Sequence, residues 1–524
     1  MLKKLEVVGR PIASCFLCSV FLALAVWTVS GSERPTGASQ QPSGSCVMPP
    51  NNAYDTTVQY VETFYPLWFT YNQAVETNHL VGPERVSPIY HSVVMINDDT
   101  VYCSAFLELV DDQGAQQPMM LTIPSTVSPD TCSPDTSVTY SILILDPYGD
   151  VYPTATDPCA GPIPTPPIPH GPPPIPGGTY ALVGPDYAGV PPIPAGAQEV
   201  QLPWNYPTII FRSDKYHSFT EPPALPDYVN QISQSYRFRS SLQLQTLSEY
   251  LDCPSGGQAE VKTEFPDFSI PYKTAADAEI LKHPIAFLIE LQTAVHSVRT
   301  PPLSACNQEL SDQFDALFGD GNWRDNSDFA RGAQAAHGEV VNNYVNGHQL
   351  PNNWTHFTNI GNWNGDDISD AIDRSSITEF CQFCNDINSA GYYHAFRDGA
   401  GRALNGNNPH GYVLTFPAPT PPAVYPGPET TRFWSLTAYT PQAIELIPNS
   451  INRYEVASYS GAHLNPDGSL SIYMATEPPA GIPIENWLPV AKGPFNVVLR
   501  DYGPPEGGSV VCDTYIPPAI ERLP

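Results

Sequence analysis

Proline limits the fold of this chain more than any other residue type, because 60 of its 524 residues are proline. This share is about twice the average for soluble proteins. Proline lacks a backbone N–H donor, breaks helices from within, and is confined in sheets to edges, strand starts and bulges. Together with a hydrophobic content of 41%, it predicts short strands around buried cores, joined by long loops.

Apolar runs bounded by turn residues form two blocks, with a block of helical periodicity between them. The first block starts at Ser92 and includes "VTYSILILDPY"; the second continues from "GYVLTFP" (411–417) to Tyr502. Short runs of this kind are typical of antiparallel sheets packed as sandwiches. The order predicts a mostly β fold with a helical segment: an N-terminal sandwich at 53–272, a helical spacer at 273–400 and a C-terminal sandwich at 401–524.

Helices are predicted from aromatic and apolar spacing. Residues 54–75 carry aromatics at mixed spacing and predict an entry helix. Pro284 is a favoured first-turn residue, and a second helix is predicted in "FARGAQAAHGEVVNNYV" (329–345). The predicted inward faces are Ile285, Leu288, Ile289, Gln292 and Val295 in the first of these two, and Phe329, Ala333, Ala336 and Val340 in the second.

Two segments have compositions that do not predict packing. Residues 32–52 are rich in Ser, Gly and Pro and predict a flexible linker. Residues 153–178 form a low-complexity proline insert, which predicts exposed polyproline II. We interpret the insert as a spacer, with a recognition ligand as the alternative.

The N-terminal 31 residues resemble a secretory signal peptide. Lys3, Lys4 and Arg10 precede an apolar run, and small residues around Gly31 offer a cleavage point. The run is also close to the shortest length that spans a bilayer, so an uncleaved anchor is the alternative. Either way, the sequence predicts a secreted or extracellular protein, or one of the secretory pathway.

The charge balance excludes some partners. The formal net charge is −30, and an acidic surface repels both nucleic acid and anionic membranes. Nine of the 11 cysteines lie beyond the signal, and an oxidising compartment predicts that most of them pair. Asn353 begins the sequon Asn-Trp-Thr, so we expect it to be a glycosylation site.

Several unusual words in the sequence resemble a known pair of families. "NDDTVYCSAFLEL", "MMLTIP" and "YSILILDPYGD" are similar to the N-terminal member, domain-of-unknown-function family 1254. "FWSLTAY", "NSINRY", "NPDGSLSIYM" and "NWLPVAKGPFNVVLRDYGP" resemble its C-terminal partner, family 1214. The resemblance covers residues 60–520 and is strongest at 411–503.

The resemblance implies two jelly-roll-like β-sandwiches, similar to those of double-jelly-roll capsid proteins and glycan amidases. It implies no established reaction. This chain departs from the family pattern in its proline insert, in its cysteines, and in Cys103, where the family tends to have Ser. These departures suggest an extracellular, disulfide-containing branch.

No motif predicts a metal or a cofactor. His-Glu-x-x-His, Gly-x-Ser-x-Gly and a Gly-rich phosphate loop are all absent from the sequence. Cys381 and Cys384 form a Cys-x-x-Cys motif without the βαβ context that thioredoxin-type chemistry needs. We interpret the motif as a structural disulfide, with redox chemistry as the alternative.

Carboxylates remain as candidates for catalysis. A glycosidase or glycan amidase of the two-carboxylate type needs two carboxyls about 5–10 Å apart, one with a raised pKa. Asp99, in the word "NDDTVY", is the first candidate and Asp146, at a strand end, is the second. The alternative is that each acid caps a turn or pairs with a base.

The stretch "FWSLTAY" (433–439) has aromatics on both faces, so this strand is predicted to be covered on both sides. Trp434 and Leu436 share one face; Phe433 and Tyr439 share the other. Five residues in this region are predicted to line a pocket for a polar ring or a carboxylate: Trp434, Arg453, Tyr454, Trp487 and Arg500. The alternative is that the arginines form ion pairs with Asp467, Glu485 or Asp501.

The function hypotheses therefore come from different classes. The first is glycan or small polar-ligand binding, with hydrolysis as an extension. The second is a structural or surface-interaction protein, for which a homo-oligomer is left open. The third is a small-molecule enzyme of secondary metabolism. An enzyme predicts carboxyls and an aromatic converging on one cavity, whereas a structural protein predicts a large apolar outer patch.

Overall fold

The structure is a computed structural model, and it describes residues 46–80, 84–85, 95, 97–111, 113–124, 138–154, 159, 161, 164–171, 175, 177–214, 241–252, 254, 272–363, 367–420 and 425–524. The predicted signal at 1–31, most of the predicted linker and parts of the proline insert lie outside these residues. No helix among the described residues is long and apolar enough to cross a membrane.

The N-terminal strands form two four-stranded sheets around one core. The first has the order β1 (Glu84–Arg85), β2 (Thr100–Phe106), β7 (Thr208–Asp214), β4 (Tyr140–Leu145). The second has the order β6 (Gln198–Gln201), β5 (Gly178–Val183), β3 (Met119–Ile123), β8 (Gln243–Thr246), and α3 (Leu247–Asp252) follows it. Apolar side chains from both sheets, among them Leu121 and Phe211, share one buried cluster.

The C-terminal strands form a second pair of sheets. One has the order β13 (Glu455–Ala457), β12 (Phe433–Tyr439), β16 (Asn496–Tyr502), β10 (Ala390–Ala395), β9 (Trp354–Thr355). The other has the order β15 (Trp487–Pro489), β14 (Leu470–Ala475), β11 (Tyr412–Phe416), β17 (Ile520–Arg522). The predicted mostly β fold is confirmed. The sheets are not purely antiparallel, because β5–β6 and β14–β15 pair in parallel.

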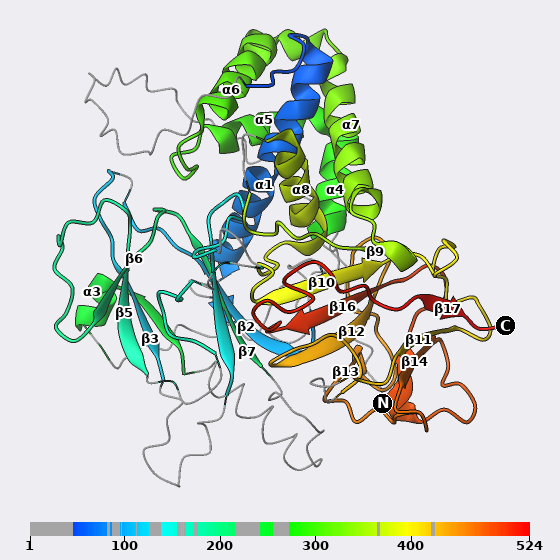
Figure 1. Ribbon diagram of the computed structural model, residues 1–524. Helices are drawn as coiled ribbons and strands as arrows, with labels where there is room; N and C mark the ends of the chain where they lie inside the picture. Colours follow the sequence, from blue (N-terminus) through cyan, green and yellow to red (C-terminus); the bar gives the residue numbers. More distant parts are fainter. Residues whose placement is uncertain are drawn as a thin grey trace, which may run out of the picture. The chain divides into compact units, whose positions relative to one another are not determined.

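Helices cover the outer face of the five-stranded sheet (Figure 1). They are α1 (Ala53–Leu80), α4 (Tyr272–Lys282), α5 (Pro284–Val295), α6 (Ala305–Phe318), α7 (Asp328–Asn342) and α8 (Ile368–Cys381). Short helical turns are η1 (Gly319–Arg324), η2 (Asn343–Gly347), η3 (Pro351–Asn353) and η4 (Ile484–Asn486). The entry helix predicted at 54–75 is α1, and α1 packs against α5, α6, α7 and α8.

Strand β12 lies between two cores, as its sequence predicts. Trp434 and Leu436 point into the C-terminal sandwich. Phe433 and Tyr439 belong to the cluster that the helices form with the outer face of the sheet. Successive side chains of a strand point to opposite faces, so this one strand contributes side chains to both cores.

The predicted inward face of α7 is confirmed, but that of α5 is rotated. Ile289, which was expected to point inward, is 42% exposed. Phe287 is buried instead, with its ring edge-on to Trp68 of α1 at 4.9 Å between centroids. The large aromatic contact decides which stripe of α5 faces inward; the buried residues are Phe287, Leu288, Leu291, Ala294 and Val295.

Three disulfides join described cysteines. Cys46 pairs with Cys306, which ties the residues before α1 to the start of α6. Cys159 pairs with Cys512, across 353 residues of chain. The third pair is Cys381 with Cys384, which closes the turn at the end of α8. The expectation that cysteines pair is therefore confirmed for these six.

Candidate functional site

Two small cavities lie on either side of the turn Gln382–Phe383–Cys384, whose residues line both of them. We call them the arginine cavity, after Arg212 and Arg500, and the Asp146 cavity. Each has a volume of about 20 Å³. A cavity of that size holds one water-sized group. Each cavity can therefore take a single polar group, either a water molecule or part of a larger ligand.

The arginine cavity is built from two cross-strand pairs in different sheets. In the N-terminal sheet, Tyr102 of β2 is the register partner of Arg212 of β7. In the C-terminal sheet, Tyr392 of β10 is the register partner of Arg500 of β16. All four side chains line the same cavity. Each arginine follows three apolar residues in a strand whose residues are all buried, so the strands carry both charges into the interior.

The two guanidinium groups use different hydrogen-bond partners. Arg212 donates from Nη1 to Asn385 Oδ1 at 2.9 Å and from Nη2 to the Phe383 carbonyl at 2.6 Å. Arg500 is 1% exposed and donates from Nη2 to the Met95 carbonyl at 2.5 Å. Its Nη1 is buried and has no hydrogen-bond partner among the described residues. A buried donor without a partner costs about 1–3 kcal/mol, and more when it is charged.

Asp99 is the nearby carboxylate. It is fully buried and accepts hydrogen bonds from the hydroxyls of Ser435 (2.7 Å), Tyr459 (2.5 Å) and Tyr502 (3.4 Å). Burial works to lower the pKa of Arg500, but Tyr439, Tyr502 and Asp99 raise it overall, so the guanidinium stays charged.

The two guanidinium groups of the arginine cavity have no direct carboxylate partner. Within the described residues, neither Arg212 nor Arg500 forms an ion pair with a carboxylate closer than 4 Å. Asp99 is the carboxylate whose charge acts on Arg500. Asp214, another acid near Asp99, pairs with Arg432. Buried charge is costly unless it is compensated.

The tyrosines add donors to the same cavity. The Tyr392 hydroxyl oxygen accepts from both the backbone N–H (3.0 Å) and the side-chain amide (2.9 Å) of Asn385. Its own hydrogen is therefore free to donate. The Tyr102 hydroxyl has no hydrogen bond within the part of the chain that the structure describes, and Gln382 lines the cavity with an unpartnered, buried amide. The free groups are thus mostly donors, which suits an anion.

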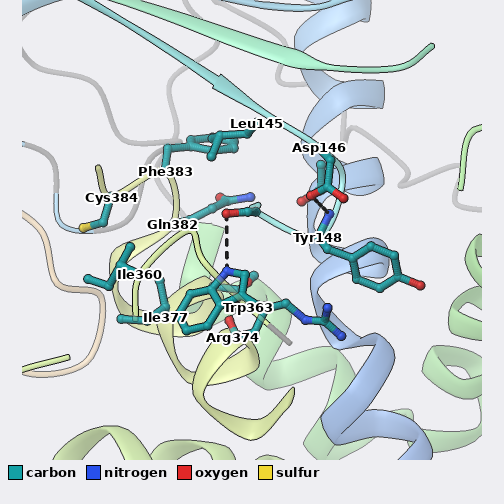
Figure 2. Close-up of a pocket in the computed structure, with 13 residues that line it drawn as sticks. Leu145, Asp146, Tyr148, Ile360, Trp363, Arg374, Ile377, Gln382, Phe383 and Cys384 are labelled. Atoms are coloured by element: carbon teal, nitrogen blue, oxygen red, sulfur yellow. Dashed lines mark hydrogen bonds between the residues drawn. The ribbon is translucent and has the colours of Figure 1, made fainter. Parts of the chain in front are cut away.

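The Asp146 cavity is shown in Figure 2. Asp146 follows β4 and begins a tight turn, in which its Oδ1 accepts the backbone N–H groups of Tyr148 and Asp150, each at 2.8 Å. Arg374 of α8 lies over the Tyr148 ring at 4.3 Å and donates from Nη2 to the Thr63 carbonyl at 2.8 Å. Trp363 donates from Nε1 to the Gly149 carbonyl at 3.3 Å, and this bond is drawn in Figure 2.

The acids of this turn have raised pKa values. Burial raises the pKa of Asp146 well above its usual range, and Asp150 raises it further. The backbone N–H bonds and Arg374 oppose the shift without cancelling it. Burial also raises the pKa of Asp150, with Arg374 acting in the opposite direction. Burial therefore acts on both carboxyls of this turn, and Arg374 is the neighbouring positive charge that opposes it.

The structure places the predicted catalytic and ligand-binding residues in several different parts of the fold. Arg500 lies close to Asp99, at the arginine cavity, and Asp146 lines the other cavity. Trp434 lies in the core of the C-terminal sandwich and lines neither cavity.

The remaining predicted ligand residues lie near β15. Arg453 donates to the carbonyls of Ile484 and, at 3.4 Å, Trp487. The ring nitrogen of Trp487 donates to the Ala475 carbonyl at 2.9 Å. Tyr454 is partly buried. The ion pairs considered for Arg453 and Arg500 with Asp467, Glu485 or Asp501 are not found in the described residues, because both arginines donate to backbone carbonyls instead.

Asn353, the predicted glycosylation site, is partly buried and is the last residue of the short turn η3. Its side-chain amide nitrogen donates to the Asp398 carbonyl at 2.9 Å. A glycan on this nitrogen would replace one of the two hydrogens that the amide can donate.

Sequence reasoning missed many residues of the two cavities, among them Arg212, Gln382, Tyr392 and Arg374. For Arg212 a signal was present, since an arginine in the apolar run "TIIFRS" matches the position of Arg500 in "VVLRDY". Gln382 and Arg374 carry no such signal, because a glutamine between cysteines and an arginine in a helix are ordinary.

A third polar cluster lies among the helices. Oxygen and nitrogen atoms of Asp277, His337 and Glu379 lie within 4.8 Å of one another, which would suit a metal ion. However, Lys273 Nζ lies 2.5 Å from Glu379 and 3.1 Å from Asp277. The ammonium group already supplies the positive charge that a metal would bring. We therefore interpret the cluster as a buried ion-pair network.

Comparison with known proteins connects the arginine cavity to two families. A family model described as "Protein of unknown function (DUF1254)" matches residues 77–240, and one described as "Protein of unknown function (DUF1214)" matches residues 389–506. The chain carries this pair of domains. Tyr102 and Arg212 lie in the DUF1254 match, and Tyr392 and Arg500 lie in the DUF1214 match. Each domain therefore contributes one Tyr–Arg pair to the arginine cavity.

Two solved structures are similar to this DUF1254–DUF1214 chain. The VPA0106 protein of Vibrio parahaemolyticus is 18% identical, with a TM-score of 0.52, and the match covers 90% of this chain and 99% of that one. An uncharacterised protein from Burkholderia cenocepacia is 12% identical, with a TM-score of 0.37 over 89% of this chain and 92% of that one. The first likeness shows the fold alone. No curated protein matches the chain.

Proposed function

We propose that this protein binds a small polar ligand through a carboxylate, or an equivalent anionic group, in the arginine cavity. The observation that carries the proposal is the buried Arg500, whose Nη1 has no partner at a cavity that Arg212 also lines. A carboxylate suits Arg212 and Arg500 because it accepts several hydrogen bonds and brings a negative charge to two guanidinium groups that have no ion pair.

A water molecule is the competing occupant. Water can accept hydrogen bonds from Arg500 and Tyr392, but it leaves the charge uncompensated. The cavity holds only one small group, so the rest of a ligand would have to lie outside it. A uronic acid or another acidic glycan satisfies both conditions, and so does a small hydroxy acid. These conditions therefore support the broader hypothesis of small polar-ligand binding over a hypothesis restricted to glycans.

The test compares acetate with acetamide, its uncharged isostere, by isothermal titration calorimetry at constant ionic strength. A charge-assisted hydrogen bond contributes about 1.5–3 kcal/mol, so acetate should bind roughly 10–100 times more tightly. Arg500→Gln should abolish this preference. Because that variant also loses the bond to Met95, Tyr102→Phe is the milder probe, since the Tyr102 hydroxyl makes no hydrogen bond to described residues.

The matched control is Tyr473→Phe, on β14, which lines neither cavity. Arg453→Gln tests the pocket expected near Trp487: loss of acetate binding in that variant would place the site there. If acetate binds no better than acetamide in the unaltered protein, the arginines stabilise the contact between the two domains. The hypothesis of a structural or surface-interaction protein is then favoured.

A further inference from the structure

The Asp146 cavity differs from the arginine cavity in its charge. Arg374 faces two carboxyls, Asp146 and Asp150, whose pKa values are both raised. Arg374 thus has two carboxyls beside it, whereas neither Arg212 nor Arg500 forms an ion pair with a carboxylate among the described residues. The Asp146 cavity therefore has less need of an anion.

Buried polar atoms line this cavity without partners. Arg374 is 3% exposed, and its Nε has no hydrogen-bond partner among the described residues. Gln382 is 5% exposed, and neither the oxygen nor the nitrogen of its side-chain amide has a hydrogen-bond partner among the described residues. The Thr70 hydroxyl of α1 also lines the cavity and makes no hydrogen bond within the described chain. The free groups thus include donors and acceptors together.

A hydroxyl group matches that mixture, because it donates one hydrogen bond and accepts two. The cavity has room for one such group. Trp363 is only partly buried at the cavity wall, so its ring can stack on the rest of a ligand, as aromatic rings do on sugar faces (Figure 2).

From this geometry we infer that the Asp146 cavity binds one hydroxyl of an uncharged polyhydroxy compound, of the sugar or polyol class. Oδ1 of Asp146 is held by two backbone N–H groups, so Oδ2 is the oxygen available to a ligand. This site is separate in charge and chemistry from the anion site proposed above, and it does not depend on that proposal.

The test is a titration of glucose and glycerol, both uncharged, followed by calorimetry from pH 5 to pH 9. The protonated carboxyl donates, so raising the pH should weaken glucose binding by about threefold to tenfold, the value of one hydrogen bond. The other titratable or charged groups facing Asp146 are Asp150 and Tyr148 on its own turn, Arg374 of α8 and Tyr71 of α1.

Asp146→Asn isolates the effect. Its amide oxygen keeps the two backbone hydrogen bonds of the turn, and its amide group is neutral at every pH, so its glucose affinity should be independent of pH. Thr70→Val should weaken glucose binding without disturbing the fold, because it keeps the shape of the side chain. The matched controls are Asp186→Asn and Thr293→Val, both at exposed positions.

Three results would overturn the inference: no saturable binding of glucose or glycerol, a pH dependence that persists in Asp146→Asn, or a crystal structure that shows an ordered water only. Acetate titrated into the same samples reports the arginine cavity, and Arg500→Gln changes that cavity alone, because Arg500 does not line the Asp146 cavity. A failure at one cavity is therefore not mistaken for a failure at the other.

Discussion

The carboxylate of Asp99 accepts a hydrogen bond from the Ser435 hydroxyl at 2.7 Å, although 336 residues of chain separate the two. Asp99 directly precedes β2, and Ser435 lies in the middle of β12. The Met95 carbonyl makes a second connection of the same kind, to Arg500 at 2.5 Å. The segment that leads into the N-terminal sheet is therefore anchored on the C-terminal sheet, and the arginine cavity lies at this junction.

Asp99→Asn should destabilise the protein by about 2–4 kcal/mol. Among the described residues, the hydrogen-bond partners of the Asp99 side chain are the hydroxyls of Ser435, Tyr459 and Tyr502, and an Asn amide nitrogen cannot accept from any of them. Urea denaturation measures the change, with exposed Asp186→Asn as the control. A variant that keeps full stability but loses acetate binding would instead assign Asp99 a direct part in the site.

Glu379→Gln should cost about 3–5 kcal/mol, because it leaves a buried ammonium group without its closest partner. Lys273 Nζ lies 2.5 Å from the fully buried Glu379, which also accepts from the Tyr65 hydroxyl. Thermal and urea unfolding provide the measurement. The exposed pair Asp328–Arg331 supplies the comparison, since Asp328→Asn should change stability by about 1 kcal/mol or less. Equal effects at the two pairs would show that the buried network is not a stabilising one.

Stability should fall as pH rises from about 6.5 to about 9, because of His337. Burial works to lower the pKa of His337, but hydrogen bonds and charges from Asp277 and Glu379 raise it to about 9. A histidine whose folded pKa exceeds its unfolded value stabilises fully below pH 6.5, and this contribution disappears as pH passes the folded value. The loss should be at most about 3 kcal/mol.

Urea denaturation at pH 6, 7.5 and 9 gives the slope, and His337→Gln should flatten it. Glu62 contributes with the same sign. Burial and the neighbouring Glu339 raise its pKa to about 8, above the usual value, so the folded state again binds more protons. A slope that is unchanged in His337→Gln would leave Glu62 as the dominant group, and a stability that rises with pH would contradict both assignments.

Removing the Cys381–Cys384 disulfide should weaken acetate binding on the order of tenfold. Phe383 adopts the left-handed conformation with φ of 64°, and its carbonyl accepts the 2.6 Å hydrogen bond from Arg212. A turn without the disulfide can relax away from this conformation, which is unfavourable for a residue with a side chain. Calorimetry on the Cys381→Ala/Cys384→Ala variant tests this.

The Cys46→Ala/Cys306→Ala variant is the control for the disulfide experiment. It removes a disulfide from the helical part of the chain and should lower the melting temperature without changing acetate affinity in the folded protein. Unaltered acetate binding in the Cys381→Ala/Cys384→Ala variant would show that packing, and not the disulfide, holds Phe383 in place.

Patterns local to one segment were good guides to the fold. The alternation in "FWSLTAY" predicted which side chains of β12 face each core, because successive strand residues point to opposite faces. On α5, a similar argument predicted the wrong buried face, because the ring contact between Phe287 and Trp68 of α1 depends on a partner far away in the sequence.

The candidate sites were only partly accessible to such reasoning. Asp99, Asp146 and Arg500 could be chosen from their positions beside strands, and all three lie in or beside the two cavities. Arg212 carried a signal in the run "TIIFRS", but its pairing with Tyr102 became visible only through the register of β2 with β7. Gln382 became visible only when the end of α8 was placed against both sheets.

The sequence by itself determined the β-rich composition, the alternating faces of the strands, the helical block and the pair of domain families, because these depend on residue types and short spacings. The tertiary structure alone decided that a tyrosine and an arginine from each domain meet at one cavity, and that Asp99 lies beside them while Asp146 lies beyond the Gln382 turn. Those outcomes depend on strand register and on contacts across hundreds of residues, which no local pattern encodes.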